Sequence, residues 1–364
     1  MLGSLNRGGT ETLVRDVLRH RSSVAFNMIG IYRKEGQLSD DYRATLVPLF
    51  KLRPKHLLDL GYLWHLRRLI RSNQLTLLHA QQPLDALFAR LASLGMPVKV
   101  VLTLHGYDTG FHCLDRFLLR LALRVSHFIL CVSNTQHTYY QKRYALLPSK
   151  VHTLYNGISF DKLDQPKPSN IRQELHLPQD GLLLGSVGNF VSVRDQMTLC
   201  RFAKRLHEAK VDFRFLFVGA KSSTEPERFD ACVRFCADNG LQSKVFFLGS
   251  RNDVPSILHQ LDAFLYASDH DTFGIAVIEA MAAALPVFVN EWDVMKEMTD
   301  GGRYATLYQT AREEDLLNVF NDFIMHPEPY RQKAIEAAEW VRSKYSIQAH
   351  LKTLESLYVK CLKA

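Results

Sequence analysis

Two carboxylates that lie eight residues apart, Asp271 and Glu279, have the chemistry to hold a sugar nucleotide. They follow the strand-like segment Ala263–Tyr266 and enclose a short polar turn that leads into an apolar, helix-like run. In an α/β protein such a strand, turn and helix present backbone N–H groups and a positive dipole end to phosphate. Carboxylates suit sugar and ribose hydroxyls because each oxygen accepts charge-assisted hydrogen bonds. The spacing predicts Asp271 on the loop and Glu279 about one and a half turns inside the helix, both facing one crevice.

This segment resembles family 4 of the retaining glycosyltransferases, whose signature is two acidic residues separated by seven that flank Phe-Gly. Here Asp271 stands where the family usually has glutamate, and Phe273, Gly274 and Glu279 match the family pattern. The resemblance implies a GT-B fold, with two Rossmann-like domains facing an interdomain cleft. It also implies that a sugar is transferred from a nucleotide diphosphate donor with retention of the anomeric configuration.

Two loops of the second half resemble the family's donor-binding loops. Leu184–Gln196 is similar to the loop that holds the donor diphosphate, with Arg194 where lysine is usual and Asn189 where arginine is usual. One positive charge is therefore missing, and either Asn189 donates neutral hydrogen bonds or another basic residue substitutes. Val245–Pro255 is similar to the strand and loop that contact the nucleotide base.

In the first half, Gly8 and Gly9 resemble the family's N-terminal glycine loop, where the lack of side chains lets the backbone approach sugar and acceptor. His105 follows the predicted strand Val98–Leu104 and matches the family histidine beside the sugar. An isolated histidine is more often structural, but the end of a strand is where ligands of such sheets bind. Ser133-Asn134 and Asn156–Ser159 match loop-shaping positions.

The resemblance thus implies three catalytic residues and nine donor-binding residues. It implies no metal ion and no other cofactor. The substrate would be a nucleotide-sugar, such as a UDP-, GDP- or ADP-sugar. The catalytic residues are His105, Asp271 and Arg194, and the donor-binding residues are Gly8, Gly9, Asn189, Arg251, Val254, Phe273, Gly274, Ile275 and Glu279.

Four other functions have less support in the sequence. Asp269-His270-Asp271 superficially matches the DxD motif of metal-dependent GT-A enzymes, but the two-domain pattern and the register of Asp271 and Glu279 argue against it. An oxidoreductase would carry a GxGxxG after a strand, which the sequence lacks. A glycoside hydrolase would pair two carboxylates across a bond. A catalytically weakened sugar-nucleotide-binding protein of the same fold stays open, because Asn189 removes a charge.

Short apolar segments alternate with amphipathic ones along nearly all of the 364 residues, which predicts an α/β protein with parallel sheets. The predicted strands are Val24–Met28, Leu75–His79, Val98–Leu104, His127–Val132 and Val151–Tyr155, then Leu182–Val187, Phe213–Val218, Val245–Leu248, Ala263–Tyr266 and Val287–Asn290. Only Met1–Gly3 precedes the glycine loop, so we expect the first strand to be missing or cut short.

The chain is long enough for two domains. A polar, proline-punctuated stretch from Phe160 to Gly181, with one short helix at most, is the expected linker. We therefore expect residues 1–160 to form the acceptor-side domain and residues 161–344 the nucleotide-sugar-binding domain. Residues 345–364 read as a helix with one packing face, Ile347–Leu362, that packs back on the first domain.

Basic residues are concentrated in the first part of the chain. Residues 1–150 hold 21 lysines and arginines against 9 aspartates and glutamates, a net charge of +12, while the remainder carries −4. The segment Lys51–Ser72, with Leu57, Leu58 and Trp64 beside Arg67, Arg68 and Arg71, predicts an amphipathic basic helix. It is interpreted either as a surface for an anionic membrane or as a core helix with a solvated basic face. No motif for nucleic acid accompanies it.

Scattered cysteines without CxxC spacing and strand-sized apolar runs predict a cytoplasmic protein with reduced thiols. We expect it at the inner face of the plasma membrane, where a lipid-linked acceptor resides. The expected partners are the donor and a glycan or lipid-linked acceptor of cell-surface polysaccharide or lipopolysaccharide synthesis.

Overall fold

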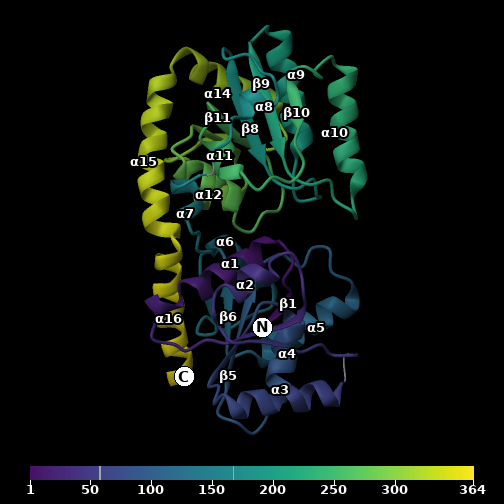
Figure 1. Ribbon diagram of the computed structural model, residues 1–364, viewed down its shortest axis with the longest axis vertical. Coiled ribbons are helices and arrows are strands. Elements are labelled where there is room, and N and C mark those ends of the chain that lie inside the picture. Colours follow the sequence, from purple (N-terminus) through teal and green to yellow (C-terminus); the bar gives the residue numbers. More distant parts are fainter. Residues whose placement is uncertain (57–58, 167) are drawn as a thin grey trace. The chain divides into compact units, whose positions relative to one another are not determined.

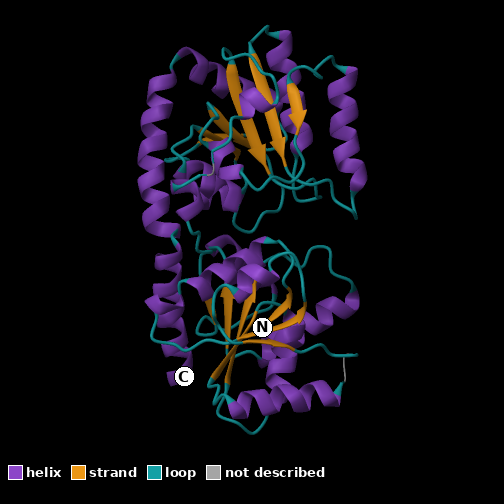
Figure 2. Ribbon diagram, in the orientation of Figure 1, coloured by secondary structure: helices purple, strands orange, loops and turns teal. Residues whose placement is uncertain are grey.

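The computed structural model describes residues 1–56, 59–166 and 168–364, which divide into two compact units (Figure 1). Unit 1 comprises Met1–Ile158 and Tyr345–Ala364, and unit 2 comprises Ser159–Lys344. Each unit contains parallel strands with helices packed on them (Figure 2). Among the described helices, none is both long enough and apolar enough to cross a lipid bilayer.

Unit 2 is built on one parallel six-stranded sheet of order β10-β9-β8-β11-β12-β13. Its strands are β8 (Leu182–Val187), β9 (Phe213–Val218), β10 (Val245–Phe247), β11 (Ala263–Tyr266), β12 (Val287–Asn290) and β13 (Thr306–Tyr308). The five predicted strands of this half are confirmed, four of them to the residue. The sixth, β13, was not predicted because its three residues give too short a pattern.

The helices of unit 2 cover this sheet and its ends. They are α7 (Asp161–Asp164), α8 (Ile171–Glu174), α9 (Gln196–Glu208), α10 (Pro226–Asp238), α11 (Val254–Leu258), α12 (Ile275–Ala282), α13 (Asp293–Met298), α14 (Glu313–Met325) and α15 (Pro327–Tyr345). The prediction of a linker with one short helix at most is wrong. The stretch holds α7 and α8, and it belongs to unit 2, where Leu163 and Ile171 are buried.

The order of the six strands reverses direction between β8 and β11. From β8 the chain moves outward through β9 to β10, and it then returns to β11 on the other side of β8. In parallel α/β sheets the loops on either side of such a switch point diverge and leave a crevice at the carboxyl ends of the strands. The loops after β8 and β11 are therefore the place where a ligand of unit 2 is expected.

Unit 1 contains a three-stranded sheet, β1-β2-β3, and a four-stranded sheet, β4-β5-β6-β7. The strands are β1 (Leu2–Ser4), β2 (Gly30–Lys34), β3 (Leu49–Lys51), β4 (Leu77–Ala80), β5 (Lys99–Leu104), β6 (Phe128–Cys131) and β7 (Val151–Thr153). The helices are α1 (Gly9–Arg19), the 3-10 turn η1 (Arg21–Ser23), α2 (Ser39–Arg43), α3 (Leu60–Ser72), α4 (Pro83–Ala92), α5 (Cys113–Val125), α6 (Asn134–Arg143) and α16 (Ile347–Lys363).

The first strand is present but short. β1 pairs in parallel with β2, with Leu2 opposite Tyr32 and Ser4 opposite Lys34. The expectation of a missing or shortened strand is therefore met by a strand of three residues.

Two predictions for unit 1 are wrong in position. Val24–Met28 is not a strand, because no described strand pairs with it, and β2 begins only at Gly30.

The basic helix begins at Leu60 and not at Lys51, which ends β3. Asp59 fixes that start by accepting a hydrogen bond from the backbone N–H of Tyr62 at 2.9 Å. Leu57 and Leu58 lie outside the described residues.

The last helix, α16, packs on unit 1 through the face that the sequence predicts. Ile347, Leu351 and Leu354 are buried in a cluster with residues of α1 and β6. Gly157 explains how closely it approaches, because a Cβ at this position would lie 2.5 Å from the Cβ of His350. The loop-shaping motif Asn156–Ser159 therefore acts, at Gly157, by making room for α16.

Candidate functional site

The switch point of unit 2 is closed by an ion pair between Arg194, after β8, and Asp271, after β11. Both side chains are largely buried, at 17% and 12% exposure. Burial raises the pKa of the Asp271 carboxyl, and the Arg194 guanidinium opposes this rise. The structure thus brings together two of the three predicted catalytic residues at the point where the topology predicts a ligand.

A tyrosine that sequence reasoning did not identify completes this pair. The hydroxyl of Tyr266 donates to Asp271, and the guanidinium of Arg194 lies over the Tyr266 ring at 4.6 Å from its centroid. The ring restrains the cation while the hydroxyl orients the carboxylate. The only signal in the sequence was the position of Tyr266 at the carboxyl end of a predicted strand.

The backbone around Asp271 is held by a second group that the sequence did not reveal. The Asn290 side chain accepts from the Ser268 N–H at 3.0 Å and donates to the Ser268 carbonyl at 2.7 Å. The Ser268 hydroxyl donates to the Val193 carbonyl at 3.0 Å and accepts from the Asp271 N–H at 3.3 Å. Ser268 thereby joins the two loops of the switch point, and Asn290 fixes Ser268 from the neighbouring strand.

Gly274 shapes the start of α12. It adopts a left-handed conformation at φ +84°, and a Cβ there would lie 2.7 Å from the Met295 Cε. The backbone angle therefore favours glycine, and a Cβ would also displace the flexible end of the Met295 side chain. The preceding Phe273 is buried and anchors the turn. This places the first N–H groups of α12, those of Ile275 and Ala276, at the helix end that attracts anions.

Only one side of α12 escapes burial. Ile275 and Glu279 are half-buried, whereas Ala276–Ile278 and Ala280–Ala282 are buried. Residues four apart lie above one another on a helix, so Ile275 and Glu279 share a face. The predicted positions of Asp271 on the loop and Glu279 inside the helix are confirmed.

The glycine-bearing loops after β8 and β9 pack tightly against each other. A Cβ on Gly219 would lie 2.0 Å from the Gly188 carbonyl oxygen, so the two backbones touch. The Asn189 side chain accepts from the Ala220 N–H at 2.9 Å. Asn189 therefore ties the loops after β8 and β9 together through its oxygen.

Arg251 lies in an ion-pair network after β10. It donates to both Glu174 oxygens, at 2.5 and 2.7 Å, and to both Asp253 oxygens, at 2.8 and 2.7 Å. These bonds lower the pKa of Glu174 and Asp253. They fix the loop that leads into α11, where Val254 is the first residue. The contacts described for Arg251 are thus structural, at a position predicted to bind donor.

Unit 1 has its own cluster at the carboxyl edge of the sheet. His105, which follows β5, forms a hydrogen bond of 2.7 Å between its Nε2 and the Gln81 Oε1, which follows β4. Burial lowers the pKa of His105 to about 4, so the ring is neutral at physiological pH. The next residue, Gly106, accepts hydrogen bonds through its carbonyl from Gln136 at 3.0 Å and Tyr140 at 2.8 Å.

The glycine loop of unit 1 forms the start of α1. Gly8 is the N-cap in an extended conformation, and Gly9 is the first helical residue. The loop follows β1 directly, and β1 contacts β4 through Met1, whose carbonyl accepts from the Gln81 N–H at 3.2 Å. Gly8, Gly9 and His105 therefore all follow strands at the carboxyl edge of unit 1.

Within the described part of the chain, no three histidine, cysteine, aspartate or glutamate side chains are grouped to hold a metal ion. The Asp271 side chain, which belongs to the DxD-like motif, pairs with Arg194.

Two family models match the chain side by side. Residues 7–162 match the model described as Glycosyltransferase Family 4, and residues 168–340 match Glycosyl transferases group 1. Together they cover most of both units.

The relatives and solved structures agree with these matches. N-acetyl-alpha-D-glucosaminyl L-malate synthase of Bacillus anthracis is 24% identical over 314 residues, 84% of this chain and 80% of the relative. UDP-Gal:alpha-D-GlcNAc-diphosphoundecaprenol alpha-1,3-galactosyltransferase of Escherichia coli is 22% identical over 310 residues, 78% of each chain. The crystal structure of Anabaena HepE in complex with UDP-glucose superposes with a TM-score of 0.83 over 98% of both chains, at 17% identity.

The buried pair makes a prediction about stability. In Arg194→Met the Asp271 carboxylate loses its counter-ion, and we expect the free energy of unfolding to fall by about 3 kcal/mol. The double variant Arg194→Met/Asp271→Asn should regain most of that loss, because no buried charge is left. Urea unfolding measures both. As a control, Arg214→Met breaks a pair with the exposed Asp212 and should cost less than about 1 kcal/mol. Equal losses for the two single variants would contradict the argument.

Buried histidines make unit 1 sensitive to acid. Burial lowers the pKa of His105 and of His350 to about 4, and that of His79 well below its ordinary value. Each therefore takes up a proton on unfolding, so its stabilisation is complete above pH ~6.5 and is lost as the pH falls toward 4. Each should contribute a slope of about 1.4 kcal/mol per pH unit within that window. Urea unfolding at pH 7, 6 and 5 should show a smaller slope for His105→Gln; an unchanged slope would refute it.

Proposed function

The chain belongs to glycosyltransferase family 4, with the GT-B fold, and on that premise we propose a specific reaction. The protein transfers a hexose-type sugar from a nucleotide diphosphate to a glycan or lipid-linked acceptor, in cell-surface polysaccharide or lipopolysaccharide synthesis. The observation that carries this proposal is the pairing of Arg194 with Asp271 at the switch point of unit 2, beside the first turn of α12.

In this proposal the departing diphosphate is stabilised by Arg194 and by the N–H groups at the start of α12. A guanidinium offers five N–H donors, so a bond to Asp271 leaves donors for phosphate oxygens. Charge that develops on the leaving group is best stabilised by groups already in place, and Tyr266 holds the guanidinium. Glu279 accepts hydrogen bonds from the ribose hydroxyls on the half-buried face of α12.

The proposed reaction retains the anomeric configuration. The bond between the sugar C1 and the phosphate oxygen breaks through an oxocarbenium-like state, and its electrons leave with the diphosphate. The acceptor hydroxyl attacks C1 from the same side, and its proton passes to the leaving phosphate oxygen. Asp271 positions the sugar beside the switch point of unit 2. His105, whose ring is neutral, keeps in this proposal the role that the resemblance assigns to it. No step requires a metal ion.

The names of the relatives motivate the choice of substrates for the first tests. The Anabaena structure holds UDP-glucose, and the Escherichia coli relative acts on a diphosphoundecaprenol-linked sugar. We propose a UDP-sugar as the donor and a lipid-linked sugar as the acceptor. The weakened binding protein is the second candidate, because Asn189 is committed to the Ala220 N–H and adds no charge.

Donor binding tests this function. A thermal-shift panel of UDP-, GDP- and ADP-sugars in EDTA should show one class that raises the apparent melting temperature, since such a ligand binds only the folded state. Glu279→Ala should weaken that donor's affinity about tenfold, the loss of roughly one charge-assisted hydrogen bond. Arg194→Ala should mainly lower turnover.

The control is Glu227→Ala, which removes an exposed carboxylate in α10 and should bind donor like the parent. Unchanged donor affinity in Glu279→Ala would remove that residue from the site. Binding without turnover on any lipid-linked acceptor would favour the weakened protein.

We further propose that unit 1 attaches to an anionic membrane at the inner face of the plasma membrane. On α5, Leu114, Phe117 and Leu121 are 63%, 61% and 39% exposed and follow helical spacing, so they form one apolar stripe. Arg120 and Arg124 on the same helix are exposed. Apolar side chains beside arginines are the combination that binds an anionic lipid surface.

The basic helix α3 contributes to the same layer of helices. α4 packs against both α3 and α5, as Figure 1 shows for unit 1. Trp64 on α3 is 55% exposed, and Arg68 lies over its ring. Arg67 has a structural role, because it donates to the Ala92 carbonyl at 3.0 Å and the Leu94 carbonyl at 2.7 Å. The helix can thus be both a core helix and part of a membrane-binding surface, since its buried side packs on the core.

Vesicle sedimentation tests this attachment. Vesicles with 30% phosphatidylglycerol should bind the parent, and Phe117→Ser/Leu121→Ser should weaken binding at least about tenfold because two large apolar side chains are lost. Arg120→Glu/Arg124→Glu should do the same on anionic vesicles. Leu147→Ser removes an exposed leucine outside the three helices and serves as the control. Binding that is equal for all four proteins would rule out this surface.

A further inference from the structure

The loop that carries His105 is tied to α6 through more than the Gly106 carbonyl. Asp108, three residues after His105, is completely buried, whereas the next residues, Thr109 and Gly110, are exposed. Asp108 is not among the residues that the resemblance singles out. Its side chain is the buried anchor of a turn whose following residues face solvent.

The Asp108 carboxylate accepts three hydrogen bonds, all from the end of α6 and its C-cap. The Tyr139 hydroxyl donates to the Asp108 Oδ1 at 2.6 Å. The Tyr144 hydroxyl and the Arg143 Nε donate to the Oδ2 at 2.6 and 3.0 Å. Burial by itself raises the pKa of this carboxyl, but the three hydrogen bonds outweigh it, and the pKa is lowered. Asp108 is therefore ionised at physiological pH.

The groups that hold this loop lie on one face of α6. Gln136 and Tyr140, which bind the Gly106 carbonyl, are four residues apart, and Arg143 follows three residues later. Residues three and four apart are neighbours on a helix surface. Ser133 fixes the start of this helix, because its hydroxyl accepts from the Gln136 N–H at 3.2 Å. The loop-shaping motif at Ser133 therefore acts by orienting the helix that anchors this loop.

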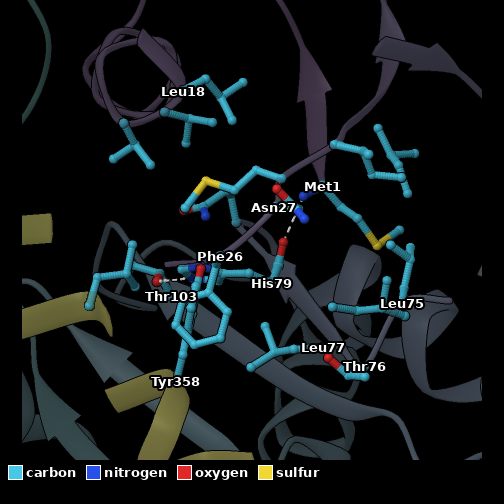
Figure 3. Close-up of a pocket in the computed structure, with 18 of the residues that line it drawn as sticks. Met1, Leu18, Phe26, Asn27, Leu75, Thr76, Leu77, His79, Thr103 and Tyr358 are labelled. Atoms are coloured by element: carbon cyan, nitrogen blue, oxygen red, sulfur yellow. Dashed lines mark hydrogen bonds between the residues drawn. The ribbon is translucent and has the colours of Figure 1, made fainter. Parts of the chain in front are cut away.

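On the other side of β5 the restraint is weaker. Gln81, which follows β4, bonds to His105. It lines a cavity of about 440 Å³ together with His79 and Thr103. Figure 3 shows His79 and Thr103 at this cavity, where the His79 Nε2 and the Thr103 hydroxyl lie 2.6 Å apart. A side chain beside a cavity lacks contacts on that side, so packing holds it less firmly than in a filled core. The firm restraint on the His105 loop therefore comes from α6, on the β6 side.

The chemistry of the anchor suits orientation better than stability. Burying an ion pair costs desolvation, and apolar side chains of similar volume often stabilise a protein equally well. Hydrogen bonds have a preferred direction, whereas apolar attraction has none. Three directional bonds from one helix to one carboxylate therefore hold the loop in a single orientation.

We propose that Asp108 is the positioning residue of His105. It holds the loop after β5 against α6, so that the His105 ring keeps one place and one orientation beside the transferred sugar. The sugar's part in this proposal rests on the proposed function, whereas the restraint on His105 is a property of unit 1 alone.

Turnover tests the part of Asp108 in the reaction. Asp108→Asn keeps the shape of the side chain but lacks the charge and the second acceptor oxygen for Arg143 and Tyr144. With the substrates proposed above, we expect kcat to fall at least about tenfold, because a small misplacement of a positioning group slows a reaction strongly. Donor affinity in the thermal-shift assay should stay at the parent value, because the groups proposed to bind the diphosphate and the ribose lie in unit 2. Tyr144→Phe removes one of the three donors and should cause a smaller fall of the same kind.

A double-mutant cycle shows whether Asp108 acts through His105. His105→Ala removes the ring, so Asp108→Asn should lower kcat no further in that background. Two losses that multiply would give Asp108 an effect of its own and overturn the proposal. The control is Asp322→Asn, which removes a carboxylate that accepts from the Tyr330 hydroxyl at 2.7 Å on α14. It should turn over substrate like the parent.

An NMR measurement tests the restraint without any substrate. In the parent, burial first and then the nearby His350 lower the pKa of His105 to about 4. The ring signal of His105, assigned by its absence in His105→Gln, should therefore stay constant between pH 8 and pH 6. In Asp108→Asn the freed loop exposes the ring to water, so the pKa of His105 should rise toward ~6.5 and the signal should shift across this range.

The two kinds of measurement separate the failures. A His105 signal that stays equally constant in Asp108→Asn, or an unchanged kcat, would overturn the role of Asp108. A parent without turnover would contradict the proposed function, and the NMR result would then decide alone whether Asp108 holds His105.

Discussion

The buried carboxylate of Asp271 constrains everything around it in unit 2. Removing an ionised group from water is costly unless a counter-ion and hydrogen-bond donors replace the lost solvent, and here Arg194 and Tyr266 replace it. Arg194 follows β8 and Asp271 follows β11, so the pair can form only if these strands are neighbours with their carboxyl ends at one edge. The Arg194–Asp271 pair therefore depends on the strand order of the sheet.

The strands of unit 2 could be read from the sequence because each is buried by the elements around it. Leu182–Val187 and Phe213–Val218 are nearly continuous apolar runs, and their ends coincide with the turns that close them. Val24–Met28 has the same kind of pattern without being a strand. An apolar sequence pattern indicates which side chains are buried. A strand also needs a neighbouring strand to hydrogen-bond with, and β1 is too short to pair with this segment.

Site residues whose positions depend on local geometry could be predicted from the sequence. Site residues whose positions depend on partners far along the chain could not. Gly274 and Glu279 follow from the turn and the helix period, which the spacing of the motif reveals. Asn290 acts on Ser268, 22 residues away, through hydrogen bonds that depend on β11 and β12 being adjacent. The partner of Arg251 was not predictable either, because Glu174 lies 77 residues earlier in an expected linker.

Asn189 keeps the loop after β8 in place but gives it no positive charge. Its side-chain oxygen accepts from the Ala220 N–H, so the loop after β8 keeps its attachment to the loop after β9 without an arginine. Arg194 is the only basic residue between Leu182 and Gln196, so in the proposed reaction this loop offers one full positive charge to the leaving diphosphate. The start of α12 adds the equivalent of about half a charge. In the proposed reaction a loop with this geometry still binds the donor, and the missing cation weighs most on the step in which negative charge develops.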